Sequence, residues 1–368
     1  MQLKMKNRVR NIYESLLIPS YSQIFFVDDS SNWVLSWEIK EIMKIAKQLG
    51  YNVNITSNFG VINQSIFYAS KYILLNPKRY LFLSSFNTHI AFSYFHGYPN
   101  SGNSTSIACY KNLKKFHRYI SRIQVSHSKM KNYVLETGIN PKKVFMIPIG
   151  INPDFFYVQT RQSKRSARKK FGIPQDAVVI GSFQKDGVGQ NEGHKPKLIK
   201  GPDVLLKTLS ILKNKIPNLF LLLSGPSRGY IINGLNKLRI PYKHFYLNYY
   251  PDICNLYQCL DLYIVSSREE GGPKAILESM TSGVPLVTTC VGQAMDLVNH
   301  GINAMMTPVE DSEGLAHYAQ IVLEDSEYRE KLVTNGLITA RKNTYFSQTS
   351  EWNKFFEGFV NKSFFDSA

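Results

Sequence analysis

Residues 261–289 read DLYIVSSREEGGPKAILESMTSGVPLVTT, and this stretch decides the fold. The apolar run DLYIVSS predicts a strand, and PLVTT predicts a second strand. Between them, a turn with two glycines and a proline leads into a segment whose apolar residues follow helical spacing, namely Ala275, Ile276, Leu277 and Met280. A strand, a helix and a strand in this order predict two parallel strands joined by a crossover helix.

The same alternation continues along the chain on both sides of this stretch. Apolar runs, several of them followed by helix-length segments, occur at residues 23–29, 51–55, 80–85, 89–96, 122–128, 144–150, 177–183, 219–225 and 244–249. We therefore predict an α/β fold in which helices cover both faces of parallel sheets.

Chain length and local composition predict two domains. The chain has 368 residues, more than one hydrophobic core usually supports. The first pattern ends in VFMIPIGINPDFF, residues 144–156, and a new one begins after a basic segment. We predict a first domain at residues 1–157, a linker at 158–175 and a second domain at 176–341. A terminal helix is expected within residues 342–368, and the resemblance to a known family that is given below implies that this helix packs back on the first domain.

The charge balance indicates an anionic partner. Lys and Arg number 44 against 27 Asp and Glu, which gives a formal charge of +17, and 43% hydrophobic residues exclude a disordered basic tail. Nucleic acid, a phosphorylated small molecule and an anionic lipid surface all fit this balance. The segment KNLKKFHRYISR, residues 111–122, predicts an amphipathic helix with a basic face, which suits either peripheral contact with an anionic membrane or ordinary solvation.

Cysteine usage and hydropathy bear on the compartment. The four cysteines form no CxxC pair and are too widely spaced for a disulfide framework or a zinc site. No apolar run approaches the roughly 18 residues of a membrane span. We expect a cytoplasmic protein. Its positive charge also fits association with the cytoplasmic face of a membrane.

The turn after DLYIVSS has the features of a phosphate site. Pro273 suits the first position of a helix, and the amides of Lys274, Ala275 and Ile276 would then point out of its positive end. Gly271 and Gly272 let a ligand approach the backbone, and Lys274 adds a cation. The alternative is an ordinary helix start in which acidic residues favour the dipole.

Two carboxylates flank this turn, and they suit hydroxyl groups rather than phosphate. Glu270 lies in the loop, and Glu278 follows about one and a half helical turns after Pro273. Together they could bracket a polyhydroxylated ligand whose phosphates lie at the helix start. A nucleotide sugar has this combination of groups.

The string E-G-G-P-K-A-I-L-E, with seven residues between Glu270 and Glu278, resembles the E-x7-E signature of retaining glycosyltransferases of the GT-B fold, family 4 in particular. The resemblance implies two Rossmann-like doubly wound domains that face each other across a cleft, the second binding a nucleotide sugar and the first lying on the acceptor side. It implies that Glu270 contacts the donor sugar, that Glu278 holds the ribose hydroxyls and that the intervening amides hold the diphosphate.

Further residues are assigned by the same resemblance. Lys200, followed by glycine, matches a diphosphate-binding lysine, and Gln184 stands where the family usually has Arg, so Lys185 is taken as the substitute cation with Lys197 as its rival. The remaining positions lie after apolar runs: Gly225 on the donor side, His96 as a contact of the donor sugar, and Asp29 and Asn32 on the acceptor side.

The function implied is transfer of a hexose from a UDP-, GDP- or ADP-sugar to an acceptor hydroxyl with retained configuration, in glycan or polysaccharide biosynthesis of the cell envelope. The acceptor would be a sugar, a lipid-linked sugar or a glycan, and no cofactor or metal is required. The alternatives are a noncatalytic or differently specialised GT-B protein and a basic nucleic-acid-binding module. No nucleic acid is expected, because no reader motif accompanies the basic residues and the carboxylates of EGGPKAILE would repel a phosphate backbone.

Overall fold

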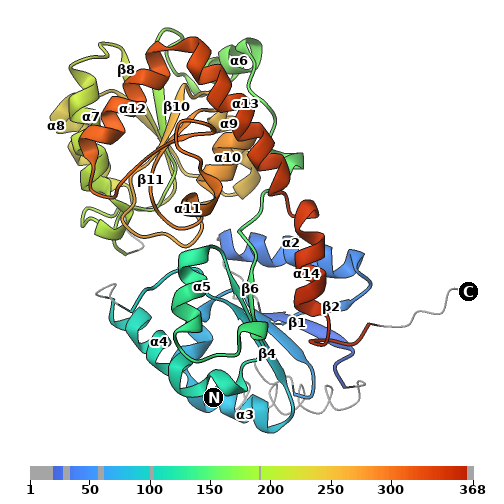
Figure 1. Ribbon diagram of the computed structural model, residues 1–368. Helices are drawn as coiled ribbons and strands as arrows, with labels where there is room; N and C mark the ends of the chain where they lie inside the picture. Colours follow the sequence, from blue (N-terminus) through green and yellow to red (C-terminus); the bar gives the residue numbers. More distant parts are fainter. Residues whose placement is uncertain (1–19, 28–33, 57–61, 100–102, 190–191, 363–368) are drawn as a thin grey trace, which may run out of the picture. The chain divides into compact units, whose positions relative to one another are not determined.

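The computed structural model describes residues 20–27, 34–56, 62–99, 103–189 and 192–362. The chain divides into two compact units, one formed by Met1–Ile149 with Tyr345–Ala368 and the other by Gly150–Thr344 (Figure 1). Each unit contains a six-stranded sheet whose neighbouring strands are all parallel. The predicted α/β class with two parallel sheets is confirmed.

The sheet of the first unit has the strand order β2-β1-β3-β4-β5-β6. Its strands are β1 (Gln23–Val27), β2 (Asn52–Thr56), β3 (Ser65–Tyr68), β4 (His89–Ser93), β5 (Arg122–Val125) and β6 (Val144–Met146). The helices of this unit are α2 (Val34–Gln48), η1 (Lys71–Leu75), α3 (Pro77–Ser85), α4 (Ser104–Phe116), η2 (His117–Tyr119), α5 (Ser128–Leu135) and α14 (Thr349–Phe356).

The helices of the first unit form two layers (Figure 1). The connection from β1 to β2 runs in the opposite direction from those that lead on to β6, so right-handed crossovers place α2 on one face and α3, α4 and α5 on the other. Tyr80 and Leu113 belong to the core under α3 and α4. Trp352 of α14 is fully buried in the core under α2, where its ring packs edge-on against Phe67. The C-terminal helix thus completes the core of the first unit.

The sheet of the second unit has the order β12-β11-β10-β7-β8-β9. Its strands are β7 (Val178–Ser182), β8 (Leu219–Ser224), β9 (Tyr242–Phe245), β10 (Leu262–Val265), β11 (Leu286–Thr289) and β12 (Met305–Thr307). Its helices are α6 (Arg161–Phe171), α7 (Pro202–Lys213), α8 (Gly229–Leu238), α9 (Ile253–Tyr257), α10 (Ala275–Thr281), α11 (Ala294–Leu297), α12 (Ser312–Glu324) and α13 (Ser326–Lys342). The chain leaves β7 toward one edge and β10 toward the other, so the topological switch point lies between these two strands.

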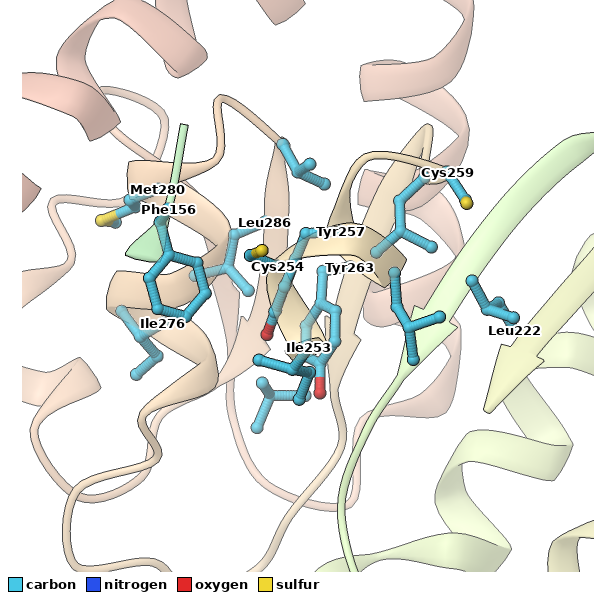
Figure 2. Packing of buried hydrophobic residues seen from close by; sticks show 14 of the residues in the cluster. Phe156, Leu222, Ile253, Cys254, Tyr257, Cys259, Tyr263, Ile276, Met280 and Leu286 are labelled. Carbon is cyan, nitrogen blue, oxygen red and sulfur yellow. The ribbon is translucent and has the colours of Figure 1, made fainter. Parts of the chain in front are cut away.

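Aromatic packing makes the region around α9 and α10 rigid. Tyr257 and Tyr263 lie side by side in the core that Figure 2 shows, with ring centroids 5.3 Å apart. Ile276 and Met280 of α10 belong to the same buried cluster. Because interiors of this kind are close-packed, the hydroxyl of Tyr257 is held in a fixed position beside α10.

One local prediction differs from the structure. Residues 80–85, read as an apolar run in the series of strands, belong to α3, because Pro77 starts a helix and the spacing of Tyr80 and Leu83 buries one face of it. The neighbouring strand is β3, which is fully buried and was not predicted.

The segment suggested as a linker packs as part of the second unit. Within residues 158–175, α6 begins at a capping box formed by Thr160 and Ser163. Arg168 is buried, with its guanidinium 2.6 Å from the carboxylate of Asp261 and 3.0 Å from the carbonyl oxygen of Cys259. The basic cluster is therefore tied to the sheet of this unit along one side of its helix.

Candidate functional site

The loops that follow β7 and β10 meet at the switch point of the second sheet. Lys200 Nζ lies 2.6 Å from each carboxylate oxygen of Glu270, which also accepts a hydrogen bond of 2.8 Å from the Ser267 hydroxyl. The Glu270 side chain is only 10% exposed and that of Lys200 22%. Lys200 and Glu270, which the resemblance assigns to the same nucleotide-sugar ligand, are thus in direct contact with each other.

The Lys200 backbone is positioned by two neighbours. The carboxamide of Gln184 donates to the Lys200 carbonyl oxygen at 2.9 Å. Gly201, which follows, has a φ of +60°, and an added Cβ would lie 1.9 Å from the Ser266 carbonyl oxygen. Only glycine fits this turn, so the Lys-Gly pair is a requirement of the backbone as well as a source of charge.

The long loop after β7 forms a hairpin. Its two arms are joined by a hydrogen bond from the Lys197 amide to the Asp186 carbonyl and by the pairing of Gly187 with Pro196. The hairpin brings Lys197 back to the start of the loop, where Lys185 lies. Burial, helped by the nearby charges of Lys200 and Lys185, lowers the pKa of Lys197, while Glu270 opposes this effect. Both proposed cations therefore belong to one group with Lys200.

A buried ion pair anchors this hairpin. The guanidinium of Arg228 lies 3.1 Å from the carboxylate of Asp186, and both side chains are fully buried. Arg228 also donates to the carbonyl oxygens of Ser182 and Ser224 at 2.7 Å, which joins the ends of β7 and β8. Burial raises the pKa of Asp186 and lowers that of Arg228, and the attraction between them opposes both shifts. The sequence analysis did not predict this pairing.

Glu278 is buried under two tyrosines. The Tyr257 hydroxyl donates to Oε2 at 2.9 Å, and the Tyr250 hydroxyl donates to Oε1. Lys274 Nζ lies 5.3 Å from the centre of the Tyr250 ring, within cation–π range. Burial raises the pKa of Glu278, while the two phenols and Lys274 oppose the rise. Tyr250 is the last residue of the run YLNYY, residues 246–250, so the end of this aromatic run lies on the carboxylate.

The turn between the two glutamates corrects one prediction. Helix α10 begins at Ala275, not Pro273, and the Ile276 amide donates to the Pro273 carbonyl oxygen at 3.2 Å. That amide is engaged inside the turn, so it does not point out toward a ligand as predicted. Gly271 is buried, Gly272 is partly exposed, and an added Cβ on Gly292 would lie 2.7 Å from the Gly271 carbonyl oxygen.

Arg268 joins the two loops of the site, and sequence reasoning missed it. Its guanidinium forms two 2.7 Å hydrogen bonds with Asp203, contacts Glu310 and donates to the Leu198 carbonyl oxygen at 2.7 Å. Its amide donates to the carbonyl oxygen of Ile199. The turn that carries Lys200 is thereby fixed to the loop that carries Glu270. The sequence signal that could have indicated a basic partner here is Asp203, an acidic residue in the first turn of α7.

The remaining predicted residues lie elsewhere. Gly225 directly follows β8 with a φ of +90°, and its carbonyl oxygen faces His244 Nε2 at 2.7 Å. His96 belongs to the first unit, where it is exposed after β4 and its carbonyl oxygen accepts a hydrogen bond from Lys71. Asp29 and Asn32 lie outside the described residues.

The arrangement can bind an anion beside a carboxylate. Lys185, Lys197 and Lys200 gather near the carboxyl ends of β7 and β10 beside the Glu270 carboxylate, and a group of three cations attracts phosphate oxygens. In the described part of the chain, no three His, Cys, Asp or Glu side chains are placed to hold a metal ion. Among the described helices, none has the length and apolar character needed to cross a membrane.

Comparisons with known proteins agree with this geometry. Residues 196–338 match the family described as Glycosyl transferases group 1. An uncharacterized glycosyltransferase of Methanocaldococcus jannaschii is 26% identical over 223 residues, which cover 60% of this chain and 53% of that protein. The D-inositol 3-phosphate glycosyltransferase of Stackebrandtia nassauensis is 23% identical over 287 residues, covering 68% of this chain and 60% of that protein. The chain thus spans about half the length of the curated relatives it matches.

Solved structures share the whole fold. Anabaena HepE in complex with UDP-glucose has a TM-score of 0.73 at 16% identity, with 91% of this chain and 99% of that chain covered. Sucrose-phosphate synthase from Thermosynechococcus elongatus has a TM-score of 0.74 at 13% identity, with 92% and 98% covered. The expected GT-B type of fold is confirmed by these likenesses. The sequence match to the family described as Glycosyl transferases group 1 lies within the second unit, at residues 196–338.

Proposed function

We propose that the protein transfers a sugar from a nucleotide-diphosphate sugar to an acceptor hydroxyl with retained anomeric configuration, as a member of glycosyltransferase family 4. The observation that carries the proposal is the contact of Lys200 with Glu270 at the switch point, next to Lys185 and Lys197. A nucleotide-sugar donor carries a diphosphate next to a hexose. Adjacent ammonium and carboxylate groups would bind these two parts, the ammonium groups contacting the diphosphate and the carboxylate the hexose hydroxyls.

The lysines are assigned to the leaving group. Negative charge develops on the diphosphate as the glycosidic bond breaks, and fixed cations in a partly buried site stabilise that charge without reorganising. In the absence of a donor, Lys200 is neutralised by Glu270. Binding of the diphosphate would draw Lys200 toward the phosphates and leave Glu270 to accept hydrogen bonds from the sugar hydroxyls.

Glu278 is assigned to the ribose of the donor. Both of its carboxylate oxygens already accept a phenol hydroxyl, and each oxygen can accept a second hydrogen bond. The carboxylate is 3% exposed, so a ligand reaches it only if the partly exposed Tyr250 moves aside. Gly225, Lys274 and the amides of the turn complete the proposed donor contacts, and His96 is retained as a sugar contact from the first unit.

The domain assignment, the acceptor and the location complete the proposal. The first unit is assigned to an acceptor that is a sugar, a lipid-linked sugar or a glycan. The reaction would serve glycan biosynthesis on the cytoplasmic side of the cell, with UDP-, GDP- and ADP-sugars as the donors to test. Contact with an anionic membrane is argued separately below.

The test is ligand-induced stabilisation of the full chain by UDP, GDP and ADP and by their sugars. A ligand at a hundred times its dissociation constant adds about 2.7 kcal/mol of stability. We expect one nucleotide to raise Tm by several degrees, and we expect Lys200→Met to abolish the shift. The matched control is Lys207→Met, which removes a lysine of α7 outside the group formed by Lys185, Lys197, Lys200 and Glu270. This variant should retain the nucleotide-induced rise in Tm.

Turnover separates the remaining alternatives. Release of the nucleotide from the stabilising donor, with a product of retained configuration by NMR, supports the proposal. Binding without turnover for any acceptor class would identify a noncatalytic GT-B protein. No stabilisation by any nucleotide, in protein shown to be folded, would refute the donor site and favour the nucleic-acid alternative.

A further inference from the structure

One part of the sequence has no acidic residue. Between Glu41 and Glu136, residues 42–135 contain twelve Lys and Arg and no Asp or Glu. This segment supplies η1, α3, α4, η2 and α5, the layer that covers one face of the first sheet. The outward surface of that layer therefore has no acidic partners of its own within the segment.

The basic residues of α4 are concentrated on its outward side. Cys109 and Leu113 are buried against the sheet, whereas four exposed basic residues follow at spacings of three, four and seven: Lys111, Lys114, Lys115 and Arg118. This spacing puts the four charges in one stripe that points away from the core.

Exposed apolar side chains lie on the neighbouring elements. On α3 and its C-cap, Phe82 and Phe86 are 46% and 43% exposed, and their ring centroids are 4.9 Å apart. On η1, Tyr72 and Leu75 are 49% and 43% exposed. The exposed Lys78 lies one turn before Phe82, so the outward side of α3 combines a cation with two aromatic rings.

These elements form one continuous face. The Asn112 side chain of α4 donates to the Leu74 carbonyl oxygen of η1 at 2.8 Å. The ring of Tyr80 on α3 packs edge-on against that of Phe116 at the end of α4, with centroids 5.5 Å apart. Figure 1 shows α3 and α4 on the same side of the first sheet. We call this surface, formed by the exposed residues of η1, α3, α4 and η2, the α3–α4 face.

We propose that the α3–α4 face docks on an anionic membrane surface. The basic stripe matches the charge of anionic headgroups, and the half-exposed phenylalanines match the boundary between headgroups and acyl chains. A face that only contacts water has no need to lack acidic residues or to expose a pair of aromatic rings, so these two features favour a docking surface. The proposal does not depend on the donor site, which lies in the second unit.

The experiment is flotation of the full chain with vesicles of phosphatidylcholine containing about 30% phosphatidylserine, at about 0.15 M salt. The triple variant Lys111→Gln, Lys114→Gln, Lys115→Gln should lower the partition coefficient about a hundredfold, since each charge near such a surface contributes about fivefold. The double variant Phe82→Ser, Phe86→Ser should lower it about tenfold. Replacing the same three lysines by arginine should leave binding unchanged.

The matched control removes three exposed charges from α6 of the second unit, through Arg165→Gln, Lys169→Gln and Lys170→Gln. It should bind like the wild type, and unchanged Tm values show that all variants are folded. Equal loss in the α6 control, equal binding to pure phosphatidylcholine, or no effect of the phenylalanine variant would overturn the proposal. So would a single-stranded RNA that binds this face and displaces the vesicles. Nucleotide stabilisation, measured in parallel, reports on the donor site alone.

Discussion

Replacing Tyr257 with Phe removes one oxygen atom from a fully buried hydrogen bond. The Tyr257 hydroxyl donates to Glu278 Oε2 at 2.9 Å, in the packed cluster of aromatic residues around β10. The Phe side chain keeps the same ring in the same space, so no cavity larger than one oxygen is created. The variant therefore isolates the effect of leaving one buried carboxylate oxygen without its donor.

The expected loss follows from the charge of the acceptor. A hydrogen bond to a charged group contributes about 1.5–3 kcal/mol to the free energy of unfolding, and we expect about 2 kcal/mol here. For a unit of this size that loss lowers Tm by about 4–8 °C. Tyr250→Phe removes the same atom from the other oxygen of Glu278, but Tyr250 is partly exposed and water can replace its hydroxyl. The control should lose less than about 1 kcal/mol.

The loss should depend on pH. Folding raises the pKa of Glu278, so its ionised form destabilises the fold, and the destabilisation disappears as the pH falls through that pKa. Tyr257→Phe raises this pKa further, because it removes a donor that favours the charged form. The difference between the variant and the wild type should therefore shrink with falling pH. Other acid-sensitive groups are the same in both proteins and cancel.

Urea unfolding followed by circular dichroism, from about pH 7.5 to about pH 5, measures this difference. A loss within about 0.5 kcal/mol of zero at neutral pH would refute the reasoning. So would a loss that is equal for the two tyrosines, or one that grows as the pH falls. The double variant with Glu278→Gln should show a smaller effect of Tyr257→Phe than the single variant, because the acceptor is then neutral.

Four further changes test other parts of the structure. Gly201→Ala should destabilise the protein by more than about 1 kcal/mol and abolish nucleotide stabilisation, since its Cβ meets the Ser266 carbonyl; thermal melting measures both. Arg268→Leu should cost about 2 kcal/mol at neutral pH. Its unfolding curve should lose less stability on acidification, because the two carboxylates whose pKa it lowers are released. Trp352→Ala should cost about 3–5 kcal/mol in chemical unfolding of the first unit. Lys197→Arg should prevent the loss of nucleotide affinity expected in calorimetry when the pH rises through the lowered pKa of Lys197.

The strands that the sequence predicts are those with long apolar runs. β8 and β10 are buried at every position, and a parallel sheet covered on both faces produces such runs. β3 and β12 were not predicted, and length does not explain this, because β3 has four residues like β10 and β12 has three like β6. Residues 80–85 are equally apolar, but their burial follows helical spacing, and only the packing of α3 against the sheet distinguishes the two cases.

In the site, too, some features could be predicted from the sequence and others could not. Lys200, Glu270 and Glu278 stand in a string specific enough to single them out, and the structure joins the first two directly. The contacts that hold them could not be predicted, because they link positions far apart in the chain. Arg268 pairs with a residue 65 positions earlier, and Tyr250 reaches Glu278 across 28 positions. Such pairs depend on which loops the strand order brings together.

The replacement of the usual arginine by Gln184 has a physical consequence. The carboxamide of Gln184 holds the carbonyl of Lys200, so this position supplies geometry and no charge. The hairpin after it returns Lys197 to the same point as Lys185, and under the proposed function an ammonium group of one of these two lysines takes the place of the guanidinium. Ammonium groups act as point charges and lack the bidentate fork of arginine, and a buried lysine loses its proton more readily. This chain would then hold a diphosphate through several clustered lysine charges and not through a bidentate arginine. Its affinity for the donor should therefore fall more steeply with increasing salt and with rising pH than the affinity of a protein that has arginine at this position.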